Sequence, residues 1–114
     1  MDIIVEHRTP PPTTVVRITG SVDGLTADTL MATLQQQIDA GNTRLIADLS
    51  GVNYTSSAGL RALLATVKQA RSAGGDFRLA AVMPSVHKVL EMSGFTTILK
   101  LYPDVELAVA SFPA

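Results

Sequence analysis

Apolar and β-branched residues gather in short runs along the chain, separated by polar and turn-forming positions. Runs of this length and composition are typical of β-strands. The predicted strands are Ile3–Val5, Thr14–Thr19, Arg44–Leu49, Phe77–Val82 and a short segment at Ile98–Leu101. The three prolines at 10–12 cannot donate ladder hydrogen bonds, so they predict a loop. We therefore expect the first two strands to form a hairpin.

Between these strands, apolar residues recur at the spacing of one helix face. The predicted helices are Ala27–Ile38, Leu60–Ala70, 84–94 and Asp104–Ser111. We expect Thr26 to be the N-cap of the first helix, because its hydroxyl can accept an unpaired backbone N–H, and Gly41 to end that helix. Gly74 and Gly75 should end the second helix, and Pro84 suits the first turn of the third.

The resulting order, β-β-α-β-α-β-α-(β)-α, predicts an α/β fold with parallel crossover connections. In such sheets, functional sites gather at the carboxyl ends of the strands. The segment Ser50–Gly59 lies at such an end, and it is predicted to be the longest strand-to-helix link. It also contains the densest run of hydroxyl side chains, so it is the first candidate for a functional site.

Composition narrows the possible functions. The chain has 114 residues and a formal net charge of −1, with 46% hydrophobic residues, 17% charged residues and no cysteine. This length predicts one domain, residues 1–114, that can bury a core without disulfides. The near-zero charge argues against strong attraction to nucleic acid or anionic lipid. With no cysteine and two histidines, no metal site is expected.

Membrane insertion is not expected either. The longest apolar run, Leu79–Met83, has the size of a strand, whereas a membrane span needs about 20 apolar residues. Asp2 and Glu6 stand where a secretory signal peptide would carry basic residues.

Ser56 and Ser57 allow two interpretations. The commoner one is helix capping, in which a serine oxygen accepts an unpaired backbone N–H. The other is phosphorylation, because a phosphate at this place would meet free N–H groups at the positive end of a helix dipole. Phosphorylation would add a charge of about −1.5 to −2 to a nearly neutral surface.

A serine hydrolase is a further alternative. Residues 57–59 match the second half of the nucleophile elbow G-x-S-x-G, but Thr55 stands where the first glycine belongs. His87 and Asp48 are the candidate triad partners, although a solvent-facing position for His87 and a strand-end cap for Asp48 are simpler roles. The chain is also too short for a hydrolase sheet, which disfavours this alternative.

The segments Leu45–Val52 and Tyr54–Leu64 resemble the signature of STAS domains, the family of anti-sigma factor antagonists. The likeness extends to Gly74–Leu79, to Val86–Phe95 and to the closing helix. It therefore covers nearly the whole chain in the family's order.

This resemblance implies a single STAS-like α/β domain with a mixed four- to five-stranded sheet and helices packed mainly on one face. It further implies a cytoplasmic protein that is not an enzyme and needs no cofactor. Such a protein binds an anti-sigma factor that is itself a serine kinase, and so releases the sigma factor. The kinase inactivates the antagonist by phosphorylating a loop serine, and a serine phosphatase restores it. Direct binding of nucleic acid is not implied.

In the family's Asp-Ser-Ser/Thr-Gly pattern the phosphorylated serine lies two residues before the glycine, which is Ser57 here. The chain departs from the pattern in two places, because Ser56 stands where the family often has Asp and Ala58 replaces the second hydroxyl residue. Ser56 is therefore the second-choice acceptor.

The expected partner-binding face combines this loop, the start of the following helix and the neighbouring strand end. Its predicted members are Ser21, Asp23, Asn53, Tyr54, Thr55, Ser56, Ser57, Ala58, Gly59 and Arg61. The alternative function is a STAS scaffold or adaptor subunit of a signalling complex or membrane transport system, without sigma-factor control. The sequence leaves the oligomeric state open.

Overall fold

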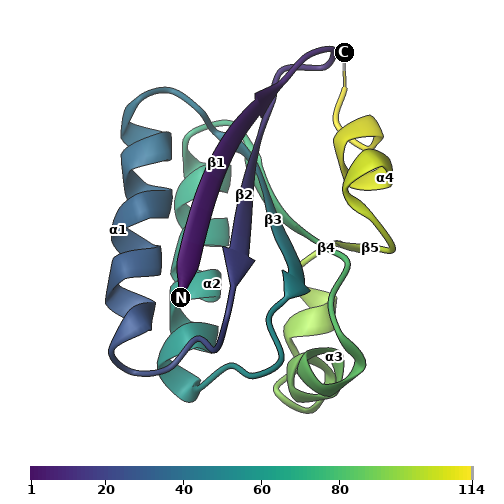
Figure 1. The fold of residues 1–114 in the computed structure, drawn as a ribbon. Helices are drawn as coiled ribbons and strands as arrows, with labels where there is room; N and C mark the ends of the chain where they lie inside the picture. The colour runs from purple at the N-terminus through teal and green to yellow at the C-terminus, as the bar shows by residue number, and fades with distance from the viewer. Residues whose placement is uncertain (114) are drawn as a thin grey trace.

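Five strands hydrogen-bond side by side in the spatial order β1-β2-β3-β4-β5 (Figure 1). Their bounds in the computed structural model, which describes residues 1–113, are β1 Asp2–Arg8, β2 Thr13–Thr19, β3 Arg44–Gly51, β4 Asp76–Ala80 and β5 Leu101–Tyr102. β1 runs antiparallel to β2, and every other neighbouring pair is parallel. The predicted hairpin and the predicted mixed sheet are both confirmed.

The helices cover the two faces of the sheet unequally. They are α1 Thr26–Asp39, α2 Ser57–Ser72, α3 Pro84–Met92 and α4 Val105–Ala110, with a short 3-10 turn, η1, at Phe95–Thr97. Successive strand residues point to opposite faces. Val16 and Ala47 accordingly lie in the core under α1, α2 and α3, whereas Val15 and Ile46 pack against α4 on the other face. The helices therefore lie mainly on one face, as predicted.

Within residues 1–113, no helix is both long enough and apolar enough to span a lipid bilayer.

Several predicted strand boundaries were wrong by a few residues. β3 continues to Gly51 instead of ending at Leu49, because it stays paired with the end of β2. β4 ends at Ala80, since the next residue, Ala81, has a left-handed backbone with φ of 55° that cannot continue a strand. β5 is displaced toward the C-terminus because residues 95–97 form η1.

An ion-pair cluster around the buried Asp76 and Arg78 connects the segment after α4 to the sheet. The Asp76 carboxylate accepts hydrogen bonds from Arg78 Nε at 3.0 Å and from Arg71 Nε at 2.8 Å. Arg78 also donates to Ser111 Oγ at 2.6 Å and lies 4.0 Å from the centroid of the Phe112 ring. We call these five residues the Asp76 cluster. It joins the C-terminal end of α2 to β4 and to the residues that follow α4.

Candidate functional site

Two strand-to-helix links lie together at the carboxyl ends of β2 and β3. The β2–α1 link spans residues 20–25 and the β3–α2 link spans residues 52–56. The Val22 N–H donates to the Tyr54 carbonyl at 3.0 Å, and the Ser56 N–H donates to the Val22 carbonyl at 2.8 Å. These bonds extend the pairing of β2 and β3 past the strand ends, so the two links form one continuous surface.

The β3–α2 link is shorter than the sequence predicted. The strand runs through Gly51 and α2 already begins at Ser57, so the predicted link Ser50–Gly59 was too long at both ends. The β2–α1 link is the longer of the two. The helix begins early because Ser56 caps it and because Gly59 can lie within its first turn.

Ser56 is the N-cap of α2. Its backbone is extended, with φ −83° and ψ 173°, and its Oγ accepts the Gly59 N–H at 3.2 Å. Ser57 follows as the first helical residue, and its side chain is exposed. The capping interpretation is therefore confirmed for Ser56 and not for Ser57. The hydroxyl of Ser56 is used by the helix cap, whereas Ser57 is exposed, so a second protein can reach it.

The surroundings of Ser57 favour a negative charge. Its own N–H and that of Ala58 lie in the first turn of a 16-residue helix, where amides have no intrahelical acceptor. The positive end of the helix dipole lies at the same place, and the first turn contains no acidic residue. Arg61 is exposed and four residues further on, the spacing at which helix side chains are neighbours. A phosphate on Ser57 would thus meet donors and a cation.

Gly59 sets how closely α2 approaches the β2–α1 link. It is buried, and a Cβ at this position would overlap Thr55 Oγ1 and lie 2.9 Å from Val22 Cγ1. Thr55 is itself only 8% exposed. Thr55 and Gly59 therefore form the packed floor of the surface, and Ser57 and Arg61 stand above it.

Most of the other predicted site residues surround this floor. Ser21 Oγ donates to Asn53 Oδ1 at 3.3 Å, which joins the exposed side chains of the two links. Tyr54 is 54% exposed. The structure therefore brings these residues into one surface, as the sequence predicted, while their contact with a partner stays a prediction.

Asp23, and not Thr26 as predicted, supplies the side-chain oxygen that accepts backbone N–H groups at the start of α1. Its Oδ1 accepts the Leu25 and Thr26 N–H groups, each at 2.9 Å, at the start of α1. Hydrogen bonds from the Thr26 N–H and hydroxyl lower the pKa of Asp23. Thr26 is the first helical residue and not the N-cap, so that prediction was wrong. The carboxylate replaces the hydroxyl because it reaches two amides at once.

Three residues that were not predicted from the sequence lie in or next to this surface. Leu25, in the β2–α1 link, is 88% exposed, and Met83, just before α3, is 37% exposed. Ser85 Oγ donates to the Asn53 carbonyl at 3.1 Å, which ties the start of α3 to the β3–α2 link. Leu25 carried a usable signal, because it follows a glycine and lies outside the apolar repeat of α1. Met83 and Ser85 carried none, since only the fold brings α3 to this place.

The hydrolase alternative finds no support in the geometry. Asp48 accepts the Ser50 N–H at 3.0 Å and pairs with Arg17 Nε at 3.2 Å. Burial raises the pKa of Asp48, but these hydrogen bonds outweigh it and the net pKa is lowered. His87 pairs with Glu91 at 2.8 Å. Among the hydrogen bonds of residues 1–113, none connects Ser57 with either proposed partner.

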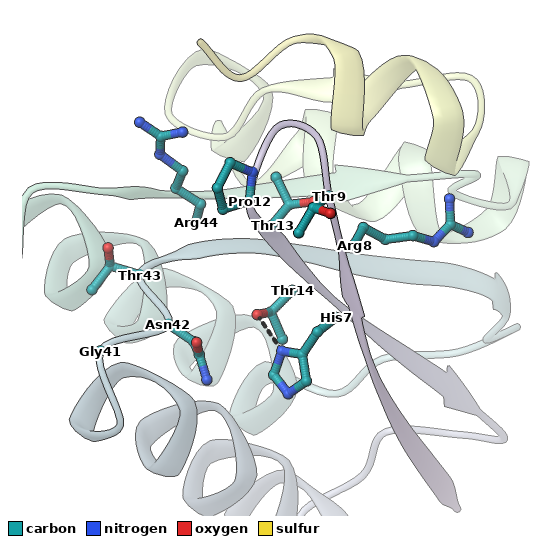
Figure 2. Close-up of a pocket in the computed structure, with 10 residues that line it drawn as sticks. All are labelled: His7, Arg8, Thr9, Pro12, Thr13, Thr14, Gly41, Asn42, Thr43 and Arg44. Atoms are coloured by element: carbon teal, nitrogen blue, oxygen red, sulfur yellow. Dashed lines mark hydrogen bonds between the residues drawn. The ribbon is translucent and has the colours of Figure 1, made fainter. Parts of the chain in front are cut away.

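A hollow of about 550 Å³ lies at the opposite end of the sheet, between the β1–β2 loop and the α1–β3 loop. Figure 2 shows that Arg8 and Arg44 point away from one another, so they do not converge on a common ligand. Arg8 is held by Glu6 and Glu106, and Arg44 donates to the Pro113 carbonyl. The hollow is therefore the weaker candidate site.

Comparisons with known proteins identify the fold and the family. The STAS domain family model matches residues 4–108. The candidate anti-sigma factor antagonist BtrV of Bordetella bronchiseptica is 40% identical over 93 residues, which cover 82% of this chain and 80% of BtrV.

Solved structures agree. An anti-sigma factor antagonist from Mycobacterium paratuberculosis matches with a TM-score of 0.86 and 26% identity, covering 96% of this chain and 92% of that one. The phosphorylated form of the Bacillus cell fate determinant SpoIIAA matches with a TM-score of 0.74 and 22% identity, covering 96% of this chain and 97% of that one. The SpoIIAA likeness shows a shared fold.

Proposed function

The chain belongs to the STAS domain family of anti-sigma factor antagonists, and we propose that it works by partner switching controlled through Ser57. In this proposal the unphosphorylated protein binds an anti-sigma factor that is also a serine kinase, and the sigma factor is released. The protein acts by binding in the cytoplasm, without catalysis and without a cofactor. A serine phosphatase resets the switch.

The observation that carries the proposal is the difference between two adjacent hydroxyls. Ser56 Oγ is occupied by the Gly59 N–H, whereas Ser57 is exposed at the first position of α2. A kinase can reach the Ser57 oxygen without unfolding the helix cap. This geometry supports Ser57 as the acceptor and Ser56 as the second choice.

The proposed binding face surrounds Ser57 and is suited to a protein partner. Exposed apolar side chains, Leu25 and Tyr54, stand beside exposed polar groups on Ser21, Asn53 and Arg61. Apolar anchors with a polar rim are typical of protein interfaces. The packed floor under them holds the two links at a fixed separation.

Phosphorylation would change this face by charge alone. The Ser57 oxygen attacks the γ-phosphorus of ATP, an O–P bond forms, ADP leaves and the hydroxyl proton is released. The product carries about −1.5 to −2 charge units near neutral pH. A partner packed over Ser57 would then have to exclude water from this added charge, and the desolvation cost weakens the complex. The amides at the start of α2 tolerate the phosphate in the free protein.

The first experiment identifies the acceptor. Purified protein is incubated with its cognate anti-sigma kinase and ATP, and the phosphate is located by mass spectrometry. We expect modification at Ser57, its loss in Ser57→Ala, and retention in Ser56→Ala. Phosphate on neither serine contradicts the switch, and phosphate on Ser56 alone contradicts the assignment.

The second experiment measures binding. We expect Ser57→Ala to bind the kinase as the parent does and to be insensitive to ATP, whereas Ser57→Asp binds more weakly. Equal affinities of the two variants contradict the electrostatic mechanism. Association with a transporter or a large signalling complex, with no kinase bound, would favour the scaffold alternative instead.

A further inference from the structure

The outer edge of β1 is an unpaired strand edge. β1 pairs with β2 along its whole length, from Asp2 opposite Thr19 to Arg8 opposite Thr13. No other strand within residues 1–113 lies beside it (Figure 1). An edge of this kind presents unpaired N–H and C=O groups that can pair with a further strand.

The two edges of the sheet differ in how they are protected. β5, at the far edge, consists only of Leu101–Tyr102 and is followed at once by Pro103. β1 is 7 residues long and contains no proline, glycine or lysine, and its register with β2 has no bulge. Its Ile4 side chain is 57% exposed. Natural proteins usually shorten, charge or distort an edge to prevent pairing. β1 is neither short nor distorted, and its charged residues are Asp2, Glu6 and Arg8.

We propose that β1 pairs antiparallel with β1 of a second copy of this chain, about a two-fold axis at Val5. A two-fold axis between antiparallel strands runs perpendicular to the sheet, so it places one residue opposite its own copy. The charges of β1 decide which residue this is. The proposal concerns self-association and does not rest on the proposed function.

Three registers can be compared. An axis at Ile4 would place Asp2 opposite Glu6 of the second copy, and an axis at Glu6 would place that residue opposite itself. Like charges directly opposite one another destabilise a sheet. An axis at Val5 places Asp2 opposite Arg8 of the second copy, once on each side of the axis, and pairs all 7 residues of the strand. Only this register combines full length with opposite charges.

The other side chains of β1 are compatible with this register. Ile3 and Val5 already pack against the core on the face covered by helices, so pairing extends that face across the axis. On the other face, the Ile4 side chains of the two copies become diagonal neighbours. Arg8 already donates to Glu6 and to Glu106, but its guanidinium has five N–H groups and can hold a further carboxylate.

The proposed dimer leaves the site at Ser57 free. The two-fold axis reverses the direction of every strand, so the carboxyl ends of β2 and β3 lie at opposite ends of the joined sheet in the two copies. Each copy therefore keeps its own exposed links, and a dimer can bind two partner molecules. Failure of self-association would leave the proposed function untouched.

The first test measures mass and its dependence on charge. Light scattering of the full chain should give twice the monomer mass of 12.0 kDa, with dissociation on dilution. Asp2→Arg or Arg8→Asp alone should raise the dimer dissociation constant about tenfold, because each change creates two pairs of like charges. The double variant Asp2→Arg with Arg8→Asp should return toward the parental value. Thermal unfolding of each variant shows whether the monomer stays folded.

The second test fixes the register. The chain contains no cysteine, so Val5→Cys introduces a single thiol. Directly opposed residues in antiparallel strands have Cα atoms about 4.5 to 5.5 Å apart, within the range of a disulfide. Ile3→Cys is the matched control, because it lies on the same strand and face with the same half-buried side chain but opposite His7 of the second copy. Mild oxidation should convert Val5→Cys to a covalent dimer and leave Ile3→Cys monomeric.

The outcomes are decisive in either direction. A concentration-dependent dimer, restored by the charge swap and trapped by Val5→Cys alone, supports the proposal. A monomer at the highest soluble concentration overturns it, as does a dimer that Val5→Cys and Ile3→Cys trap equally. Equal dimerisation of the single and double charge variants overturns the proposed register.

Discussion

The two ends of α2 are held in opposite ways. At its C-terminal end, Arg71 reaches into the Asp76 cluster, where the side chains of Asp76 and Arg78 are only 11% and 10% exposed. At its N-terminal end, one serine oxygen caps the helix and the next residue, Ser57, is exposed. One end is held by an ion-pair network in which Asp76 and Arg78 are buried and Arg71 is partly exposed, and the other by a single neutral cap.

This difference separates stability from function. A buried ion pair with one partner removed is strongly destabilising, whereas a surface hydroxyl beside a helix cap costs almost nothing to change. A switch needs a place where a charge can be added without unfolding the protein. The N-terminal end of α2 meets that requirement, and the C-terminal end does not. The following variants test this contrast, beginning with the largest expected effect.

Asp76→Ala should lower the free energy of unfolding by about 3 kcal/mol, because it leaves a buried guanidinium without its carboxylate. Urea denaturation measures this change. Asp39→Ala, at an exposed position on α1, is the matched control and should change stability little. Binding at the Ser57 face should be unchanged while the protein is folded. A loss no larger than that of the control would show that the cluster does not hold this end.

Lowering the pH should destabilise the protein by protonating Asp76 in the Asp76 cluster. Burial raises the pKa of Asp76, but hydrogen bonds from Arg78, from Arg71 and from the Phe77 N–H outweigh it, so the net pKa is lowered. A group with a lowered folded pKa contributes its full stability above its unfolded pKa, about 3.9 for aspartate, and loses it as the pH falls through the folded value. Stability should therefore fall below about pH 4.

The Asp76 carboxylate should account for much of this acid-induced loss of stability. In Asp76→Ala the acid-induced loss should be smaller than in the parent, although the lowered pKa of Asp48 leaves a part of it. Urea denaturation at a series of pH values gives the comparison. Identical pH profiles for the two proteins would contradict the role of Asp76.

At the other end of α2, Gly59→Ala should have the next largest effect, a loss of about 2 kcal/mol through overpacking. The added Cβ overlaps Thr55 and crowds Val22, which forces the helix away from the β2–α1 link. Gly24→Ala is the control, since a Cβ there meets no atom within 4 Å. We expect weaker kinase binding for Gly59→Ala than for Gly24→Ala. Equal stability of both variants would show that the packing of Thr55 and Val22 around residue 59 can adjust to a Cβ.

Ser56→Ala should cost about 1 kcal/mol, the usual value of a lost N-cap. The Gly59 N–H then loses its acceptor, and the first turn of α2 frays. Hydrogen exchange of the amides at 57–60, read alongside urea denaturation, locates the effect. Unchanged protection of these amides would contradict the cap.

The sequence predicted the order of elements and the surface that forms the candidate site because both depend on local patterns. The hairpin, the crossovers and the position of the two serines at the start of α2 all follow from β-branched runs, helical spacing and turn residues. The hydrogen bonds of Asp23 to the Leu25 and Thr26 N–H groups could not be predicted, because an aspartate and a threonine near a helix start are both good acceptors and only the backbone path selects between them.

Contacts between residues far apart in the sequence could not be predicted from the sequence alone. The Asp76 cluster joins residues 71–78 to residues 111–112, and nothing in the spacing indicates that these meet. The start of α2 at Ser57 was missed because a glycine is a poor residue for a helix interior. Only the contact with Thr55 and Val22 explains why glycine is needed there.

Ser57→Ala should have the smallest effect on stability, within about 0.5 kcal/mol, because its exposed side chain is not the cap. Alanine has the higher helix propensity, so a slight gain is compatible with this expectation. The matched comparison is Ser56→Ala, one residue earlier with the same change in atoms, measured by urea denaturation under the same conditions. Equal losses would contradict the structural difference between the two hydroxyls, and a larger loss for Ser57→Ala would contradict Ser56 as the cap. If Ser57→Ala leaves stability unchanged and also abolishes phosphorylation, the Ser57 hydroxyl is not needed for folding and is available for regulation.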